Sequence, residues 1–166
     1  MPDPLFHLST ALLPGALFGP RHTGAFVLGT LLPDLGSRLP GLALERVVAL
    51  GVPIPEFVFT PWSVLHVPLG AGLGAVVLAY VFHETERRAA ATWLIAGVAL
   101  HLGLDTLQFH HNGGYPLLYP CSMELYQIGI FGSEATVPWS APVALVSVIA
   151  WAVRVRNLPK PADVPD

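Results

Sequence analysis

The chain has 166 residues, of which 53% are hydrophobic and 11% charged, and its formal net charge is −3. A soluble globular domain carries about 25% charged residues, so this sequence holds too little charge for a surface that faces water on all sides. We therefore expect an integral membrane protein with no nucleic-acid partner. The single cysteine, Cys121, excludes an internal disulfide and a cysteine-rich zinc cluster.

Two short apolar segments make up most of the N-terminal third. Residues 4–19 carry no ionisable side chain except His7, and residues 24–35 carry none except Asp34. Both are shorter than the roughly 20 residues that cross a bilayer as a helix. They predict a pair of short, closely packed helices joined at residues 20–22. A re-entrant pair buried against other helices is the alternative.

Three later segments are long enough, or nearly so, to cross a bilayer. They are residues 62–82, 89–107 and 137–153. The third carries no charged residue and has a tryptophan near each end, as membrane interfaces favour. The sequence therefore predicts an all-α, multi-pass transmembrane helical bundle, with three long spans and the N-terminal helical pair.

The remaining segments connect or follow these helices. Residues 42–50 are expected to form a short interfacial helix, and the three prolines within residues 51–61 indicate a loop. Residues 109–135 are rich in Gly, Pro and Tyr and predict a long loop, a feature that is usually functional in a compact protein. Residues 1–157 then form one membrane-embedded domain, followed by a polar, proline-rich tail at 158–166.

Arginine and lysine positions predict the orientation. Arg87 and Arg88 lie between the first two long spans, and three further basic residues follow the third span. Because cytoplasmic loops are enriched in Lys and Arg, both clusters and the C-terminus are expected on the cytoplasmic side of the cell's inner membrane. Arg38 and Arg46 fall on the opposite side and run against this assignment.

The most informative motif is a histidine and an aspartate inside an apolar span. His101 and Asp105 are four residues apart, so both project from one face of the predicted helix and can chelate one cation. Burying an aspartate in a membrane helix costs about 3 kcal/mol on insertion scales, so Asp105 needs a partner. The partner is a metal ion or, alternatively, the histidine alone, in a hydrogen-bonded pair that only fixes helix packing.

Other ionisable residues fall at the same predicted depth and favour the metal. They are His7, Asp34 and His66. Together with the His–Asp pair they offer three imidazoles and two carboxylates, a donor set that suits zinc and similar divalent ions. In the loop that follows, His110 is a candidate further ligand, whereas we expect His111 to be solvated.

Several neutral residues are expected to support this site. Gly70 and Gly74 have the spacing of close helix packing, which would bring His66 toward His101. In the loop, Gly113 and Gly114 permit close backbone approach. Gln108 and Tyr115 are candidates for orienting a substrate.

The order of these motifs resembles the YdjM-type family of membrane-bound metal-dependent hydrolases. The resemblance covers the chain to about Ser122, and it is carried by His7, Leu32-Pro33-Asp34, His66, His101-xxx-Asp105 and the Gly113–Ser122 run. That family is in turn distantly similar to the zinc-dependent phospholipase C and P1 nuclease group, which are helical enzymes with clustered zinc ions.

The resemblance implies that His7, Asp34, His66, His101 and Asp105 are zinc ligands, with His110 as a further candidate. The soluble enzymes also carry a later His-xxx-Glu pair and use their N-terminal residue as a ligand. This chain lacks that pair, and Met1 lies six residues before His7. One or two ions are therefore expected rather than three.

The function expected from the sequence is metal-dependent hydrolysis of a phosphoester in a lipid or lipid-linked substrate, near the external membrane face. Asp34 or Asp105 would bridge ions or act as the base on a water molecule, and His110 would protonate the leaving group. The alternative is a non-catalytic subunit or scaffold, alone, as a homo-oligomer or in a larger complex. A transporter ranks last, because it would need polar residues in both halves of the bundle.

Overall fold

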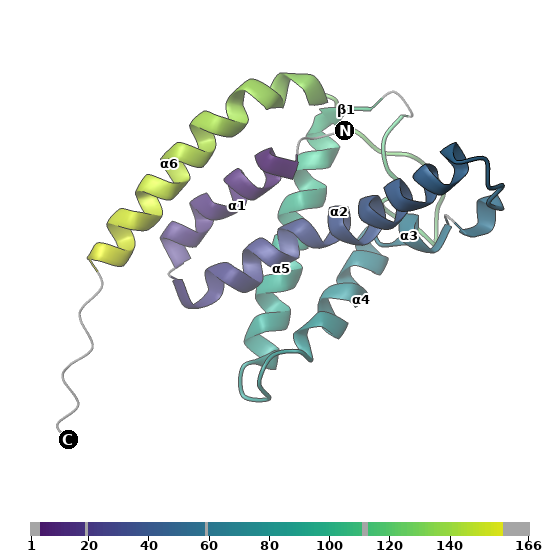
Figure 1. The fold of residues 1–166 in the computed structure, drawn as a ribbon. Helices are drawn as coiled ribbons and strands as arrows, with labels where there is room; N and C mark the ends of the chain where they lie inside the picture. The colour runs from purple at the N-terminus through teal and green to yellow at the C-terminus, as the bar shows by residue number, and fades with distance from the viewer. Residues whose placement is uncertain (1–3, 19, 59, 111–112, 158–166) are drawn as a thin grey trace.

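A computed structural model describes residues 4–18, 20–58, 60–110 and 113–157. The predicted tail at 158–166 and His111 lie outside these residues. The described chain is mostly helical, as predicted, with one two-stranded parallel pair (Figure 1). The elements are α1 (Pro4–Phe18), α2 (Pro20–Ala49), η1 (Glu56–Val58), α3 (Thr60–Val64), α4 (Pro68–Ala79), α5 (Arg87–Leu107), β1 (Gln108–Phe109), β2 (Phe131–Gly132), η2 (Ser133–Thr136) and α6 (Val137–Arg156).

The N-terminal helical pair is present, but its second member is much longer than predicted. Helix α2 has 30 residues and contains the apolar segment 24–35 and all of the segment 42–50 except Leu50. The prediction of a separate interfacial helix over 42–50 is therefore wrong. Pro33 and Pro40 lie inside α2, where each removes one main-chain hydrogen bond without ending the helix.

The predicted span over residues 62–82 is also wrong, because the chain leaves the helical conformation at Leu65–Val67. Pro68 is the cause. A proline disfavours helical geometry in the residue before it, and Val67 has an extended backbone, with φ −119° and ψ 155°. Helix α4 then has only 12 residues, about 18 Å at 1.5 Å per residue. That is well short of a bilayer core of roughly 30 Å.

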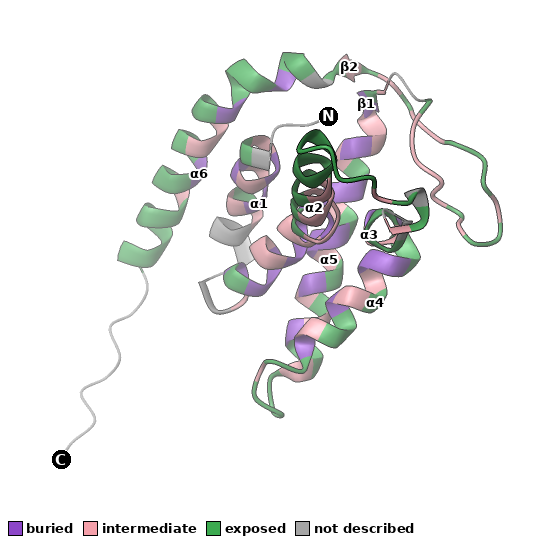
Figure 2. Ribbon diagram, turned by 45° about the vertical axis from the view of Figure 1, so that its right-hand side comes forward, coloured by how far each residue is buried: buried purple, intermediate pink, exposed green. Residues whose placement is uncertain are grey.

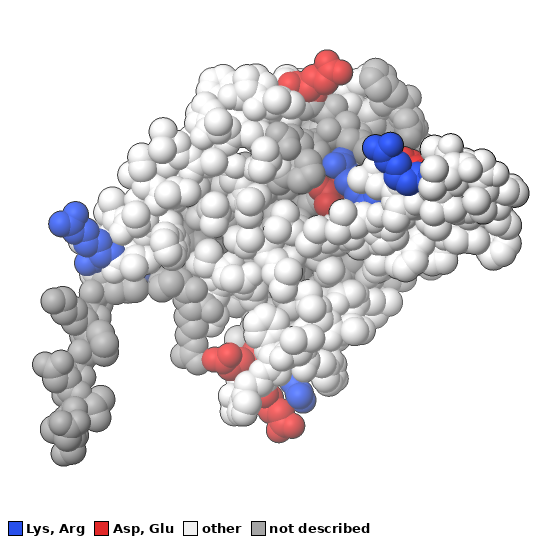
Figure 3. Space-filling view, viewed as in Figure 1, with Lys and Arg blue, Asp and Glu red and all other residues white. Residues whose placement is uncertain are grey.

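Two helices are long and apolar enough to cross a membrane, α5 at residues 87–107 and the helical stretch 134–156 that contains α6. They match the second and third predicted spans. Helix α6 is exposed along most of its length (Figure 2). The face of the molecule seen in Figure 3 has few charged side chains, and these lie at its edges and in a hollow at the upper right.

Helix α5 lies at the centre of the fold and packs against α2 and α4. A stripe of Ala71, Ala75 and Ala79 on α4 is buried against α5, where Leu94 and Val98 complete the core. The small residues that pack α4 against α5 are therefore alanines. The predicted role of Gly70 in close packing against another long helix is wrong. A Cβ on Gly70 would meet the carbonyl oxygen of Val64 at 2.0 Å, so this glycine faces the short helix α3.

The closest helix crossing is between α2 and α5 and depends on two other glycines. A Cβ on Gly29 would lie 2.1 Å from the carbonyl oxygen of Leu94, and one on Gly97 would lie 2.2 Å from that of Phe26. Each glycine therefore faces the main chain of the opposite helix. Small residues allow helix backbones to approach this closely, and the crossing sets the distance between functional side chains on α2 and α5.

Helix α6 packs along α1 (Figure 1). Serine side chains join the two helices. The Ser147 hydroxyl donates to the carbonyl oxygen of Ser9 at 2.8 Å, and the Ser9 hydroxyl, which also contacts the Leu5 carbonyl of its own helix, lies 3.1 Å from the carbonyl oxygen of Ser140. Polar side chains of this kind join helices in an apolar setting.

Candidate metal centre

The five residues expected to bind metal come together inside the bundle. His7 is on α1, Asp34 on α2, His66 in the turn between α3 and α4, and His101 and Asp105 on α5. All five side chains are buried, and those of His7, His101 and Asp105 are fully so. Four separate segments therefore supply the cluster, which only the packed bundle can assemble.

Asp105 is the centre of the cluster and faces three imidazoles. Its Oδ1 lies 3.2 Å from His7 Nε2, and its Oδ2 lies 2.8 Å from His66 Nε2 and 3.3 Å from His101 Nε2. The Nε2 atoms of His66 and His101 are only 3.4 Å apart. The rings of His7 and His101 are stacked, with centroids 4.1 Å apart. Three imidazole nitrogens thus converge on one carboxylate.

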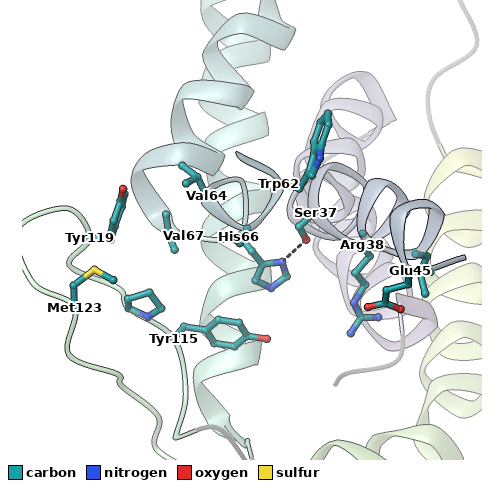
Figure 4. A pocket seen from close by; sticks show the side chains of 14 residues that line it. Ser37, Arg38, Glu45, Trp62, Val64, His66, Val67, Tyr115, Tyr119 and Met123 are labelled. Carbon is teal, nitrogen blue, oxygen red and sulfur yellow. Dashed lines mark hydrogen bonds between the residues drawn. The ribbon is translucent and has the colours of Figure 1, made fainter. Parts of the chain in front are cut away.

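Ser37 contacts the ring of His66 at the nitrogen that does not face Asp105. The Ser37 hydroxyl lies 2.7 Å from the carbonyl oxygen of Pro33, to which it can donate, and 3.0 Å from Nδ1 of His66 (Figure 4). Nε2 of the same ring lies 2.8 Å from Oδ2 of Asp105. The ring of His66 is therefore held through both nitrogens, one by Ser37 and one by Asp105.

A proton on Nε2 of His66 or a metal ion beside it can join this ring to the carboxylate of Asp105. Other buried atoms in the cluster lack a hydrogen-bond partner among the described residues: both ring nitrogens of His7, Nδ1 of His101 and Oδ1 of Asp105. The 3.2 Å approach of His7 Nε2 to Asp105 Oδ1 is close enough for an ion pair but lacks the angles of a hydrogen bond. Buried polar atoms are normally satisfied, and a metal ion would satisfy several of these at once.

The donor atoms form two overlapping groups. His7, His101 and Asp105 make one, and Asp34, His66 and His101 make the other, with the ligand atoms of each group within 4.8 Å of one another. Imidazole and carboxylate donors in this number suit a zinc-type divalent ion. The residues therefore fit the expected metal, and His101 is common to both groups.

Asp34 has a second neighbour that the sequence analysis placed elsewhere. Arg38 lies in α2, one turn after Asp34, and its Nε is 3.0 Å from Asp34 Oδ1. Arg38 lies beyond the predicted apolar segment 24–35, but α2 continues through this region and keeps it on the same helix as Asp34. The spacing of four residues that pairs them is readable in the sequence, but only once the helix is known to extend past residue 35.

The loop after α5 closes over this end of the bundle. Its main-chain N–H groups at Ile128 and Ile130 donate to the carbonyl oxygens of Thr106 and Leu107, at 2.6 and 2.7 Å. They satisfy carbonyls that the end of a helix leaves without partners. Gly114, with φ +112°, permits the bridge between Tyr115 and Tyr126, since a Cβ there would meet the Tyr126 carbonyl oxygen at 2.2 Å.

His110 lies beside the cluster but belongs to neither donor group. Its Nε2–H donates to the main-chain carbonyl oxygen of Asp105 at 2.8 Å, and its ring packs edge-on against Tyr115. Tyr115 also stacks on His66, with ring centroids 5.0 Å apart. Burial raises the pKa of the Tyr115 hydroxyl, and the negative charge of Asp105 raises it further, so this group keeps its proton.

Two other residues of this region stand apart from the donor groups. Gln108 is fully buried, and both polar atoms of its amide lack a partner among the described residues. Glu124 is exposed and accepts a hydrogen bond from the Tyr126 hydroxyl at 2.9 Å. The acceptor raises the pKa of Tyr126. Glu124 is therefore engaged with the loop itself.

A cavity of about 680 Å³ adjoins the cluster and is lined by His66, Arg38 and Tyr115 together with several apolar side chains (Figure 4). This volume is typical of a site for a small organic ligand. We refer to it below as the side cavity. Ser37 also lines it. Neither Ser37 nor Arg38 was predicted to be a site residue. Both follow Asp34 within about one helical turn, which places them near its face of α2.

No family model, curated protein or solved structure matches this chain. The resemblance to the YdjM-type family therefore rests on the motifs named above.

Proposed function

We propose that the protein is a membrane-bound, metal-dependent hydrolase that acts on a phosphoester of a lipid or lipid-linked substrate. The supporting observation is the buried cluster in which imidazole and carboxylate donor atoms lie within 4.8 Å of one another, several of them without a hydrogen-bond partner among the described residues. It lies next to a cavity of small-molecule size. A buried cluster of metal-donor atoms that adjoins a ligand cavity favours a catalytic site.

The proposed location is the cell's inner membrane, with the C-terminus in the cytoplasm. Its support is the apolar length of α5 and α6 and the basic residues in the first turn of α5 and the last turn of α6. The cluster lies toward the C-terminal end of α5, the end opposite Arg87. In this orientation the site lies near the external face of the membrane.

The residues divide into those that hold the ion and those that handle substrate. His7, His66, His101 and Asp105 would hold it, with Asp34 as the ligand of a second ion or as the base. When bound, a zinc-type ion polarises a phosphoryl oxygen and lowers the pKa of a bound water toward 7. Ser37 orients His66 through Nδ1, and such contacts tune ligand basicity. His110, at the rim of the cluster, is the candidate proton donor to the leaving group.

A second candidate is a non-catalytic membrane subunit with a structural cation site. The 2.8 Å contact between His66 and Asp105 also fits a buried imidazolium–carboxylate pair, and Arg38 already lies against Asp34. A closed site of this kind would stabilise the bundle without turnover. An open coordination position distinguishes a catalytic zinc site from a structural one.

The test is the metal content of the purified protein beside His101→Ala, with His83→Ala as the matched control. His83 is exposed and lies in the turn before α5. We expect one or two ions per chain in the wild type and in His83→Ala, and fewer in His101→Ala. Phosphate or headgroup release from mixed lipid vesicles should require the metal and stop with a chelator. Release that is absent, or insensitive to the chelator, would favour the structural subunit.

A further inference from the structure

Arg38 brings a positive charge to the wall of an otherwise mostly apolar cavity. The side cavity is bounded on one side by α2, on another by α3 and the turn after it, and on a third by the loop around Tyr115. Its apolar wall includes Trp62, Val64, Val67 and Met123. A cavity with one charged region and one apolar region matches a ligand with the same two parts.

The guanidinium of Arg38 is incompletely satisfied by the protein. Its side chain is only 20% exposed, and Nη2 is buried without a hydrogen-bond partner among the described residues. Asp34 Oδ1 approaches Nε of Arg38 at 3.0 Å. A guanidinium has five N–H donors in a fixed fork that suits phosphate. A buried donor left without a partner costs about 1–3 kcal/mol, so an anionic ligand group would stabilise this arrangement.

Two further polar groups face the same region. Figure 4 shows the Tyr115 hydroxyl and the His66 ring directed toward the space beside Arg38. All three residues line the side cavity. A tyrosine hydroxyl can donate a hydrogen bond to an anion. Glu45 also lines the cavity; it is exposed and lies two helical turns beyond Arg38 on α2, and Figure 4 draws its carboxylate on the same side of the cavity as the arginine.

We propose that the side cavity is a binding site for a membrane phospholipid, in which Arg38 and Tyr115 hold the phosphate and the apolar wall around Trp62 and Met123 holds part of an acyl chain. In this position the phosphate is next to His66, at the edge of the metal cluster. The hydrolysis of a phospholipid bound in this cavity rests on the proposed function, whereas its binding there does not. A free phosphate ion would use Arg38 and leave the apolar wall without a role.

The test is calorimetric binding of hexyl phosphate to the full-length protein in maltoside micelles with chelator present, with empty micelles subtracted. Inorganic phosphate and hexanol are the comparison ligands. We expect hexyl phosphate to bind at least about tenfold more tightly than either, since both parts of the cavity contribute. Equal binding of hexanol would show an apolar cavity only, and equal binding of inorganic phosphate would show an ion site only. Either result would overturn the proposal.

The variants are Arg38→Gln and Trp62→Ala, with Arg46→Gln as the matched control. Arg46 is an exposed arginine on the same helix that does not line the cavity. Arg38→Gln should weaken hexyl phosphate binding about tenfold or more, and Trp62→Ala should reduce the advantage over inorganic phosphate. Arg46→Gln should bind as the wild type does. Unchanged binding in Arg38→Gln, with a normal circular dichroism spectrum, would overturn the proposal.

The binding and hydrolysis measurements test the phospholipid site and the proposed hydrolase function separately. Binding that depends on Arg38, in a protein that hydrolyses no phospholipid with metal present, would overturn the proposed function only. Metal-dependent hydrolysis with binding independent of Arg38 would overturn the phospholipid site only. Arg38→Lys adds a check on geometry, because a lysine keeps the charge but not the planar fork. We expect it to recover part of the affinity.

Discussion

Helices α5 and α6 look alike in length and apolarity, yet they differ in what their polar residues do. Helix α5 and the helical stretch 134–156 that contains α6 are both long and apolar enough to cross a membrane. In α5, 39% of the most apolar stretch is buried and the polar residues form a His–Asp cluster, whereas in the stretch that contains α6 only 17% is buried and the buried polar residues of α6 are serines. Apolar length therefore identifies two similar helices, and the helices packed against each one decide whether its polar residues form a cluster.

The largest expected effect comes from the carboxylate at the centre of the α5 cluster. Asp105→Asn should abolish metal binding and metal-dependent activity while the protein stays folded and inserted. Asn has nearly the same shape and is neutral, so insertion becomes easier, but it is a poor zinc ligand. Metal content and chelator-sensitive lipid hydrolysis measure the effect. Ser147→Ala on α6 is the control, and full metal content in Asp105→Asn would place the site elsewhere.

A smaller effect on metal binding is expected from removing the Ser37 hydroxyl of α2, which contacts His66 of the metal cluster. Ser37→Ala removes the hydroxyl that holds Nδ1 of His66. Loss of such a supporting contact typically lowers metal affinity 10–100-fold, and competition with a chromogenic chelator measures it. Thr92→Ala is the control, because the Thr92 hydroxyl is exposed and bonds only within its own helix at Arg88. Equal metal affinity in Ser37→Ala and the wild type would show that His66 is held by other contacts.

Close packing of α5 can be tested apart from its chemistry. Gly97→Ala places a Cβ against the main chain of α2 at Phe26, which should destabilise the protein by about 1–3 kcal/mol. Gly103→Ala adds the same group to the same helix where nothing lies within 4 Å. It should be neutral or stabilising by up to about 1 kcal/mol. Thermal unfolding in detergent compares them, and equal unfolding temperatures would contradict the close crossing.

The smallest expected effect is on α6. Ser147→Ala removes the hydrogen bond to the Ser9 carbonyl oxygen of α1, and such bonds between membrane helices contribute about 0.6 kcal/mol on average. The unfolding temperature should fall slightly, and metal content should not change. A loss of metal would mean that α6 helps to position His7 through α1, and the contrast between the two helices would then be weaker.

The sequence was most informative where a single segment carried the signal. The spacing of His101 and Asp105 placed both on one face of one helix, and the long apolar runs of α5 and α6 gave helices close to their observed bounds. These predictions held because helical periodicity and apolar length are local properties of the chain. The same reasoning failed at Pro68, where one residue divided an apolar run into α3 and α4.

By itself the sequence determined the mostly helical character, the two membrane-length helices and the donor types available for a metal. Only the tertiary structure decided that His7, Asp34 and His66 reach the pair on α5, and that Arg38 and Ser37 belong to the same site. The physical reason is that the α2–α5 crossing depends on two glycines, Gly29 and Gly97, each facing the main chain of the other helix. Close packing between two helices far apart in the chain depends on how their surfaces fit, and the hydrophobic periodicity of either helix alone does not show that fit.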